Sequence, residues 1–213
     1  MPIAMFVKSD MGVLKLDVTS MALLAMWEIH YIHRGIIYTY NAPRIAPHSL
    51  FVVISALVFN LANGYLNGRG IGPLSSYDAN YLTSPRFLIG ASIFFIGMAI
   101  NILSDYSVFA QRRLADAKKH KDGVKDISSL PPQEKYVIPR DGLFELVSCP
   151  AYFGEIVEWI GWAVAANCNA GWAFAFFTFA NLAPRGVAAH KWYKDTFKKA
   201  YPKGRKAVLP FLW

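Results

Sequence analysis

Long apolar segments alternate with shorter polar connections along the chain. A membrane helix needs about 20 residues to cross a hydrocarbon core of ~30 Å, and residues 87–109 are the clearest candidate. Residues 171–183 are short for a full span, so we expect that segment to extend into the preceding turn or the following helix. The apolar segments cover residues 18–40, 49–66, 87–109, 143–166 and 171–183. This pattern predicts an all-α integral membrane bundle of about five membrane helices, with 1–213 forming a single domain.

The basic residues are concentrated in two regions next to these segments. Of the 22 lysines and arginines, eight lie in the loop at 112–140 and eight at 185–206, whereas the connection at 167–170 carries none. Because basic connections stay on the cytosolic side of a membrane, we expect the loop and the carboxyl-terminal tail in the cytosol. An odd number of spans then puts the amino terminus on the opposite side, with the connection at 167–170.

Composition narrows the class of protein further. The chain is 54% hydrophobic and 15% aromatic, which is too apolar for an ordinary soluble domain. A formal charge of +8 is also seen in proteins that bind nucleic acid. Here the basic segments border apolar helices, so we expect a lipid bilayer as partner, no nucleic acid, and a monomer. A basic pocket for a phosphorylated cofactor fits the same charge.

Several common functional patterns are missing from the sequence. Cys149 and Cys168 give neither a disulfide framework nor the spacing of a metal site. His30 and His33 lack a companion carboxylate at a suitable spacing, so we expect no metal. No Gly-x-Gly-x-x-Gly follows a strand pattern, which argues against a Rossmann domain. Residues 1–15 lack the pattern of a cleavable signal peptide, and without repeats a transporter is not supported.

The segment at 148–161, which reads SCPAYFGEIVEWIG, carries two carboxylates inside an apolar run. Glu155 and Glu158 are three residues apart and therefore share one face of a helix. An ionisable group at membrane depth is costly unless it is paired or faces a polar cavity. The segment therefore predicts a functional polar pocket within the membrane domain.

Other apolar segments also carry polar clusters, mostly toward the predicted cytosolic end. Glu28, His30 and Tyr31 lie within one turn of the first segment, and the second is interrupted by asparagines at 60, 63 and 67. Such residues often pair across helices and only hold a bundle together. Converging on one cavity, they would instead suit the phosphates, ribose and amide of a nucleotide. Arginines flanking the helices are the phosphate candidates, namely Arg112, Arg185 and Arg205.

Four blocks resemble the carboxyl-terminal catalytic portion of the steroid 5α-reductases, in the family's order. They read HYIHR at 30–34, NILSDY at 101–106, SCPAYFGEIVEWIG at 148–161, and YPKGRK at 201–206 followed by LPF at 209–211. The run FAFFTF at 174–179 lies between the last two. The resemblance extends over 18–213, and the four blocks together are specific to this family.

The resemblance implies an enzyme of steroid and lipid metabolism in the endoplasmic reticulum membrane. It implies an oxidoreductase that uses NADPH to reduce the 4,5 double bond of a 3-oxo-Δ4 steroid. Hydride would pass from the nicotinamide to C5, while hydrogen bonds to the 3-oxo group stabilise the developing enolate and a proton reaches C4. The steroid itself is not specified by the resemblance.

The resemblance also assigns roles to individual residues. Tyr31 would donate a hydrogen bond to the 3-oxo group, and Glu155 would bind near the nicotinamide amide or the ribose. Glu158 and Trp159 would support the pocket. The positions that would line the cofactor pocket are Asn101, Ser104, Asp105, Arg112, Tyr136, Glu155, Arg185, Tyr193 and Arg205.

This chain departs from the family pattern in three places. The family's catalytic glutamate lies in helices upstream of residue 18, which this sequence does not include, and Glu28 is the candidate substitute. Ala151 stands where the family usually has an asparagine against the cofactor. Ala188 and Ala189 stand in a stretch that often carries histidine, although His190 remains. Two alternatives therefore stay open: a related membrane enoyl reductase acting on an enoyl-CoA or a polyprenol, and a truncated paralogue without catalysis.

Overall fold

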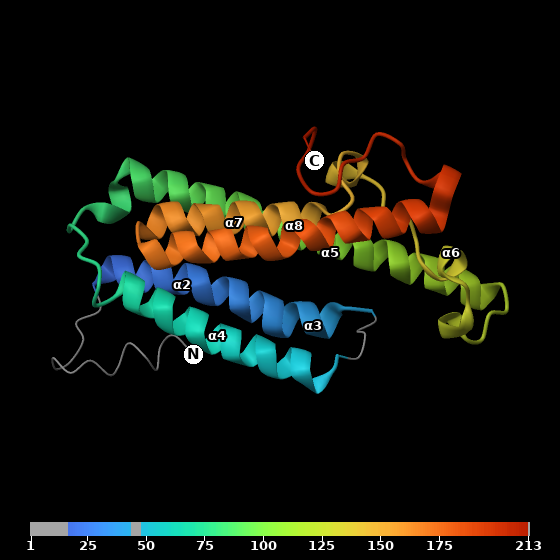
Figure 1. Cartoon of the computed structure of the whole chain (residues 1–213), viewed down its shortest axis with the longest axis horizontal. Coiled ribbons are helices and arrows are strands. Elements are labelled where there is room, and N and C mark those ends of the chain that lie inside the picture. The colour runs from blue at the N-terminus through green and yellow to red at the C-terminus, as the bar shows by residue number, and fades with distance from the viewer. Residues whose placement is uncertain (1–16, 44–47, 213) are drawn as a thin grey trace. The chain divides into compact units, whose positions relative to one another are not determined.

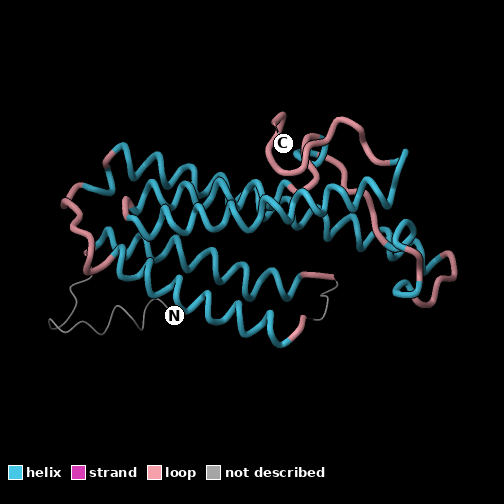
Figure 2. Tube along the Cα trace, viewed as in Figure 1, coloured by secondary structure: helices cyan, strands magenta, loops and turns pink. Residues whose placement is uncertain are grey.

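The computed structural model describes residues 17–43 and 48–212, and helices make up most of both stretches. Figure 2 shows helices and loops throughout the described chain, without a strand. The all-α prediction is therefore confirmed. The prediction about a signal peptide at 1–15 lies outside the described residues. The helices are α2 (Val18–Ile32), α3 (Tyr38–Asn41), α4 (Leu50–Ile71), α5 (Pro85–Lys121), α6 (Pro132–Lys135), α7 (Pro150–Ala166) and α8 (Asn169–Phe197).

Shorter helical turns complete the secondary structure. A π-helical turn at His33–Ile37 joins α2 to α3 without a break. The 3₁₀ turns lie at Tyr81–Thr83, Ile127–Ser129, Gly142–Glu145 and Lys198–Ala200.

Helix boundaries differ from the sequence-based prediction at the end of α5 and at the start of α7, and agree with it at α8. Helix α5 continues to Lys121, so the first part of the predicted 112–140 loop is helical. Its arginines, alanines and lysines are good helix formers, which accounts for the extension. The expected extension of the 171–183 segment is confirmed, since α8 covers Asn169–Phe197. The prediction that a helix starts at 143 was wrong, because Pro150 disfavours helical geometry at the residue before it and begins α7 instead.

The chain divides into two compact units. The first comprises Met1–Phe95 and Val157–Phe177, and the second comprises Ile96–Ile156 and Thr178–Trp213. Helices α5, α7 and α8 each contribute one part to each unit.

In the first unit, α2 and α4 run side by side in opposite directions (Figure 1). Asp17 caps α2 by accepting from the backbone N–H of Ser20 at 2.8 Å. The Ser20 hydroxyl also donates to the carbonyl of Ile71, at the far end of α4, at 2.7 Å. The start of one helix is thereby fixed to the end of the other.

An aromatic cluster fills the core of the first unit. The ring of Trp27 on α2 lies 5.0 Å from that of Trp159 and 5.2 Å from that of Trp162, both on α7. Phe174 on α8 lies 4.4 Å from Trp159. Trp159 and Trp162 are almost completely buried. Tilted and edge-on contacts of this kind stabilise a core beyond the area that they bury.

Helix α4 presents large apolar side chains at the surface of the first unit. Leu50 is 73% exposed, Phe51 79% and Val58 60%. In water such a contiguous face is unfavourable, whereas in a bilayer it meets lipid. Among the described residues, α4 and α5 are the two helices long and apolar enough to cross a membrane by length and composition. This agrees with the predicted membrane bundle.

The second unit is closed by its carboxyl-terminal segment. Val147 and Lys206 form an isolated parallel β-bridge, in which the Ser148 N–H donates to the Lys206 carbonyl at 2.9 Å. The residues that follow Lys206 enter a small core with α7 and α8. That core consists of Ile156, Leu182, Ala207 and Val208.

Glycine allows the closest helix approach in the first unit. A Cβ atom at Gly161 on α7 would lie 2.2 Å from the backbone nitrogen of Phe94 and 2.7 Å from the carbonyl oxygen of Gly90. Backbone atoms cannot move aside as a side chain can, so any larger residue separates α5 from α7 here.

We predict that Gly161→Ala destabilises the protein by about 1–3 kcal/mol through overpacking. The matched control is Gly64→Ala in the interior of α4, where an added Cβ meets no atom within 4 Å. The control should leave the melting temperature in detergent unchanged or slightly higher, because alanine favours helix. Equal melting temperatures for the two variants would contradict the close approach.

Candidate active site

The predicted site residues separate between the two units. Tyr31 and Glu28, the candidate catalytic residues, lie on α2 in the first unit. All candidate cofactor residues fall within the second unit. They are Asn101, Ser104, Asp105, Arg112, Tyr136, Glu155, Arg185, Tyr193 and Arg205.

Glu155 and Asn101 form a polar contact between α7 and α5. The side-chain amide of Asn101 donates to a Glu155 carboxylate oxygen at 3.2 Å and to the Ala151 carbonyl at 3.0 Å. Asn101 is 2% exposed. A Cβ at the neighbouring Gly154 would lie 2.5 Å from the Asn101 backbone nitrogen, so glycine permits this contact.

Glu158, three residues further along α7, contacts a different helix. Its carboxylate oxygen Oε1 lies 2.7 Å from His30 Nδ1 on α2. Glu158 is 0% exposed and His30 is 5% exposed. The His30 ring also packs edge-on against Trp159 at 4.7 Å. The pair therefore ties α2 to α7 beside the aromatic cluster.

Arg205 is the most unusual cation of the second unit. Its side chain is 0% exposed, and its Nη2 donates to Glu145 Oε1 at 3.3 Å. Its guanidinium carbon lies 5.4 Å from the centre of the Tyr201 ring. Its Nε and Nη1 are buried and have no hydrogen-bond partner among the described residues. Buried donors left without acceptors are costly, so they mark a place where an acceptor-rich group fits.

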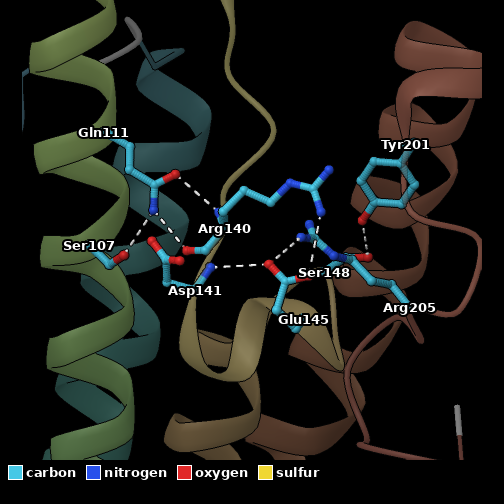
Figure 3. Close-up of polar contacts among 8 residues, drawn as sticks. All are labelled: Ser107, Gln111, Arg140, Asp141, Glu145, Ser148, Tyr201 and Arg205. Carbon is cyan, nitrogen blue, oxygen red and sulfur yellow. Dashed lines mark hydrogen bonds and ion pairs between the residues drawn. The ribbon is translucent and has the colours of Figure 1, made fainter.

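Glu145 links Arg205 to the end of the α6–α7 connection, as Figure 3 shows. The Asp141 backbone N–H donates to its carboxylate at 3.1 Å, and Arg140 lies 3.4 Å away. That N–H, followed by the charges of Arg205 and Arg140, lowers the pKa of Glu145. Two guanidinium groups thus share the Glu145 carboxylate.

Ser148 is the centre of a second polar cluster in the same unit. Its hydroxyl oxygen lies 2.5 Å from His190 Nδ1, 2.6 Å from the Tyr201 hydroxyl and 3.1 Å from the Lys206 carbonyl. Since the carbonyl can only accept, Ser148 donates its one proton there. Tyr201 and His190 must then donate to Ser148, which assigns the proton of the neutral His190 ring to Nδ1.

Tyrosines extend this second cluster. The Tyr193 and Tyr201 rings stack with centres 5.5 Å apart. Burial raises the pKa of Tyr193 to about 12, so its phenol keeps its proton. Burial, and then the charge of Lys194, lowers the pKa of His190, so its ring stays neutral. The cluster supplies hydrogen bonds and ring surface rather than charge.

Between α5 and the α6–α7 connection, the second unit holds a cavity of about 290 Å³. Ser104, Ser107 and Asp141 contribute polar groups to its lining, and most of the remaining surface is apolar. Asp141 has a φ of 75°, which a non-glycine residue seldom adopts. Its neighbour Arg140 is held by Gln111, whose side-chain oxygen accepts from the Arg140 N–H at 3.0 Å (Figure 3).

The surroundings of Arg185 and Tyr136 differ, and Tyr136 borders the tyrosine stack through Trp192, whose ring lies 5.1 Å from that of Tyr193. Arg185 is exposed on α8, and Tyr136 packs edge-on against Trp192 at 5.2 Å. Arg112 and Asp105 are half-buried on α5. The charge of Arg112 acts on Tyr193, so Arg112 lies near the tyrosine stack.

Sequence reasoning gave no role to Glu145, Ser148 or Tyr201. Ser148 and Tyr201 lie inside the segments at 148–161 and 201–206 that resemble the family. Their position in those segments could have indicated a functional role. Their partners lie 42 to 60 residues away in the chain. No local pattern indicates such pairings.

In the first unit, Tyr31 stacks on Trp27 with ring centres 5.3 Å apart. Its hydroxyl oxygen accepts a hydrogen bond from the Asn63 side chain on α4 at 3.5 Å. Glu28, one turn earlier, is half-buried, and its Oε1 has no hydrogen-bond partner among the described residues.

Removing one member of the buried His30–Glu158 pair should be costly. We predict that Glu158→Ala and His30→Ala each lower the free energy of unfolding by about 3 kcal/mol. The double variant should lose clearly less than the sum, because the second truncation removes a group already left without its partner. Equilibrium unfolding in detergent micelles measures all three, with the exposed Glu134→Gln as control. Additive losses would mean that the two side chains do not interact.

Comparisons with known proteins show what the whole sequence is similar to. Residues 46–213 match the profile of a family described as 3-oxo-5-alpha-steroid 4-dehydrogenase. An Arabidopsis thaliana protein named Steroid 5-alpha-reductase DET2 is 43% identical over 208 residues, which cover 93% of this chain and 72% of that protein. The 3-oxo-5-alpha-steroid 4-dehydrogenase 1 proteins of Bos taurus and Homo sapiens are each 40% identical, covering 89% and 90% of this chain and 67% of their own lengths.

The resemblance that the four sequence blocks carry is therefore confirmed. A match over most of the chain, at about 40% identity to several relatives, is far more than a shared fold requires. The chain belongs to the 3-oxo-5-alpha-steroid 4-dehydrogenase (steroid 5α-reductase) family of oxidoreductases.

Proposed function

We propose that this protein reduces the 4,5 double bond of a 3-oxo-Δ4 steroid, with NADPH as the hydride donor. Family membership supports steroid double-bond reduction. The observation in this chain that carries the proposal is Arg205, a fully buried cation with two nitrogen donors that lack acceptors. A nucleotide phosphate is an acceptor of the matching charge.

The residues of the second unit fit a dinucleotide phosphate. A guanidinium group binds phosphate oxygens through paired N–H donors, and burial strengthens the attraction. Arg205 shares the Glu145 carboxylate with Arg140, and two of its nitrogens have no acceptor among the described residues, so a phosphate could accept from them. When bound, NADPH supplies a hydride to C5 of the steroid. Glu155, whose carboxylate is held by the Asn101 amide, offers an acceptor for the NADPH ribose or amide.

Tyr31 is the proposed donor to the 3-oxo group of the steroid. Its oxygen-bound proton stabilises the negative charge that develops on that oxygen when the ring becomes an enolate. The stacked Trp27 ring holds the phenol in place from one side. Glu28, one turn away with a buried oxygen, is the proposed second acid.

We further propose that the protein resides in the endoplasmic reticulum membrane. The basic 112–140 region and the carboxyl-terminal tail would face the cytosol, following the distribution of lysines and arginines. The apolar exposed face of α4 supports membrane insertion. A cytosolic face for the second unit's basic residues would give them access to soluble cofactor.

The test begins with cofactor binding to the full chain in detergent. NADPH should raise the melting temperature, and NADH should raise it much less. Progesterone and testosterone are then incubated with enzyme and NADPH, and mass spectrometry follows the gain of two hydrogen atoms. Selective binding followed by reduction of the steroid supports the proposal. A folded, monodisperse sample that binds no NADPH would exclude it and favour a paralogue without catalysis, whereas binding without steroid reduction would favour an enoyl-CoA or polyprenol substrate.

Two variants should separate cofactor binding from turnover. We predict that Glu155→Gln weakens NADPH affinity by about tenfold with little effect on steroid binding, since a charged hydrogen bond contributes roughly 1.5–3 kcal/mol. Tyr31→Phe should lower kcat by about a hundredfold and spare NADPH affinity, as expected for loss of an oxyanion donor. Binding titrations and steady-state kinetics measure both.

Matched controls accompany each variant. Glu134→Gln makes the same change at an exposed position, and Tyr40→Phe does so at a tyrosine that is 90% exposed. Both controls should behave as the native protein does. Unchanged NADPH affinity in Glu155→Gln would remove that residue from the proposed site, and equal loss of affinity and kcat in Tyr31→Phe would make Tyr31 structural.

A further inference from the structure

A chain of buried side-chain hydrogen bonds ends on the Tyr31 oxygen in the first unit. The indole N–H of Trp162 on α7 donates to Asn67 Oδ1 on α4 at 3.4 Å. The Asn67 amide nitrogen donates to Asn63 Oδ1 at 2.9 Å. The Asn63 amide nitrogen donates to the Tyr31 hydroxyl oxygen on α2 at 3.5 Å. Three helices are thereby joined in one polar line.

The direction of this chain follows from the chemistry of its first member. An indole nitrogen can only donate, so Asn67 must turn its oxygen toward Trp162 and its NH₂ group toward Asn63. The same NH₂ group donates to the Asn63 backbone carbonyl at 3.1 Å, which fixes this orientation a second time. Asn63 must then present its own NH₂ group to Tyr31. The tyrosine oxygen is therefore an acceptor in this contact.

The chain lies where unsatisfied amides would be very unfavourable. Asn63 is 7% exposed, Asn67 2% and Trp162 0%. They lie on or against α4, a mostly apolar helix. Asn60 on the same helix differs, because it is exposed and its amide donates to the Ala56 carbonyl of its own helix at 2.7 Å. Of these three asparagines, only the buried Asn63 and Asn67 form hydrogen bonds with side chains of neighbouring helices.

We propose that Asn63 and Asn67 are positioning residues that hold Tyr31 as a hydrogen-bond donor toward its substrate. A hydroxyl whose oxygen already accepts a hydrogen bond directs its own proton to another acceptor. Accepting that bond also polarises the O–H group and strengthens it as a donor, by roughly 10–30% per bond. The substrate's role in this inference depends on the proposed function, but the orientation of the phenol does not.

This chain of hydrogen bonds acts on kcat rather than on the affinity for substrate. The charge on the substrate oxygen is greatest in the transition state, so a stronger phenol donor favours the transition state over the bound ground state. A chain that only joined helices would lower stability and would leave kcat of the folded enzyme unchanged. The ratio of kcat to KM effects distinguishes the two roles.

The kinetic test uses Asn63→Leu, Asn63→Asp and Trp162→Phe in the full chain. Asn63→Leu removes the donor, and we expect a roughly tenfold lower kcat with the steroid KM within about twofold. Asn63→Asp keeps the shape but places an acceptor against the Tyr31 oxygen, so it should lower kcat at least as much. Trp162→Phe should cost less, because it leaves the Asn63 donor in place. The control is Asn60→Leu, which should match the native enzyme.

A double-mutant cycle decides whether Asn63 acts through Tyr31. In a Tyr31→Phe background, Asn63→Leu should lower kcat no further, because the oxygen it serves is gone. The full tenfold loss in that background would overturn the proposal. Circular dichroism and melting temperatures confirm that each compared variant is folded, and the isosteric Asn63→Asp serves if Asn63→Leu does not fold.

A readout that needs no turnover separates this inference from the proposed function. Tyrosine labelled with ¹³C at Cζ gives a resonance for Tyr31, assigned as the one lost in Tyr31→Phe. Asn63→Leu and Asn63→Asp should move that resonance, and Asn60→Leu should not. If the native protein reduces no steroid but the resonance moves, the proposed function fails, and the hydrogen-bond chain from Trp162 to Tyr31 is still supported. If the resonance stays in place in folded Asn63→Leu and Asn63→Asp, the chain does not reach Tyr31 and the inference fails.

Discussion

Polar side chains on apolar helices must find polar partners within the protein, and most of the arrangement described above follows from this constraint. A carboxylate or an amide in a low-dielectric interior has a large desolvation cost that only specific partners offset. Glu158 is met by His30, Glu155 by Asn101, and Asn67 by Trp162. Each pairing joins two different helices, so satisfying the polar groups also fixes which helices are neighbours within each unit.

Arg205 departs from this pattern, because only part of its guanidinium group is satisfied. Glu145 satisfies one of its nitrogens, and the Tyr201 ring lies against its flat face. Two nitrogens stay buried without acceptors among the described residues. A structural role alone would leave this cost without compensation. Binding of a negatively charged group, as proposed above for NADPH, would offset this cost.

The sequence was a good guide to the helices and a partial guide to the site. Apolar periodicity located α4 and the apolar half of α5, because those patterns are local. It misplaced the start of α7, since apolar residues at 143–149 look helical until Pro150 is considered. The sequence blocks that contain Tyr31, Glu155 and Arg205 indicated the family, and the family itself is confirmed.

The partners of those residues were not predictable in the same way. Glu145 lies 60 residues from Arg205, and Asn67 lies 95 residues from Trp162. Such contacts depend on which helices pack together, and hydropathy does not specify that. The asparagines of α4 illustrate the point, because in the sequence they only interrupt an apolar segment. Only the structure shows that Asn60 bonds within its own helix, whereas Asn63 bonds to α2 and Asn67 bonds to α7.

The β-bridge between Val147 and Lys206 has a consequence for biosynthesis. The strand-like segment just before α7 is paired only when residues 206–207 arrive, and Val208 then enters the core between α7 and α8. Helices α7 and α8 precede residue 206 in the chain and are therefore synthesised before it. The small core of the second unit needs Ala207 and Val208 in addition to residues of α7 and α8, so a premature stop before residue 206 would leave that core open.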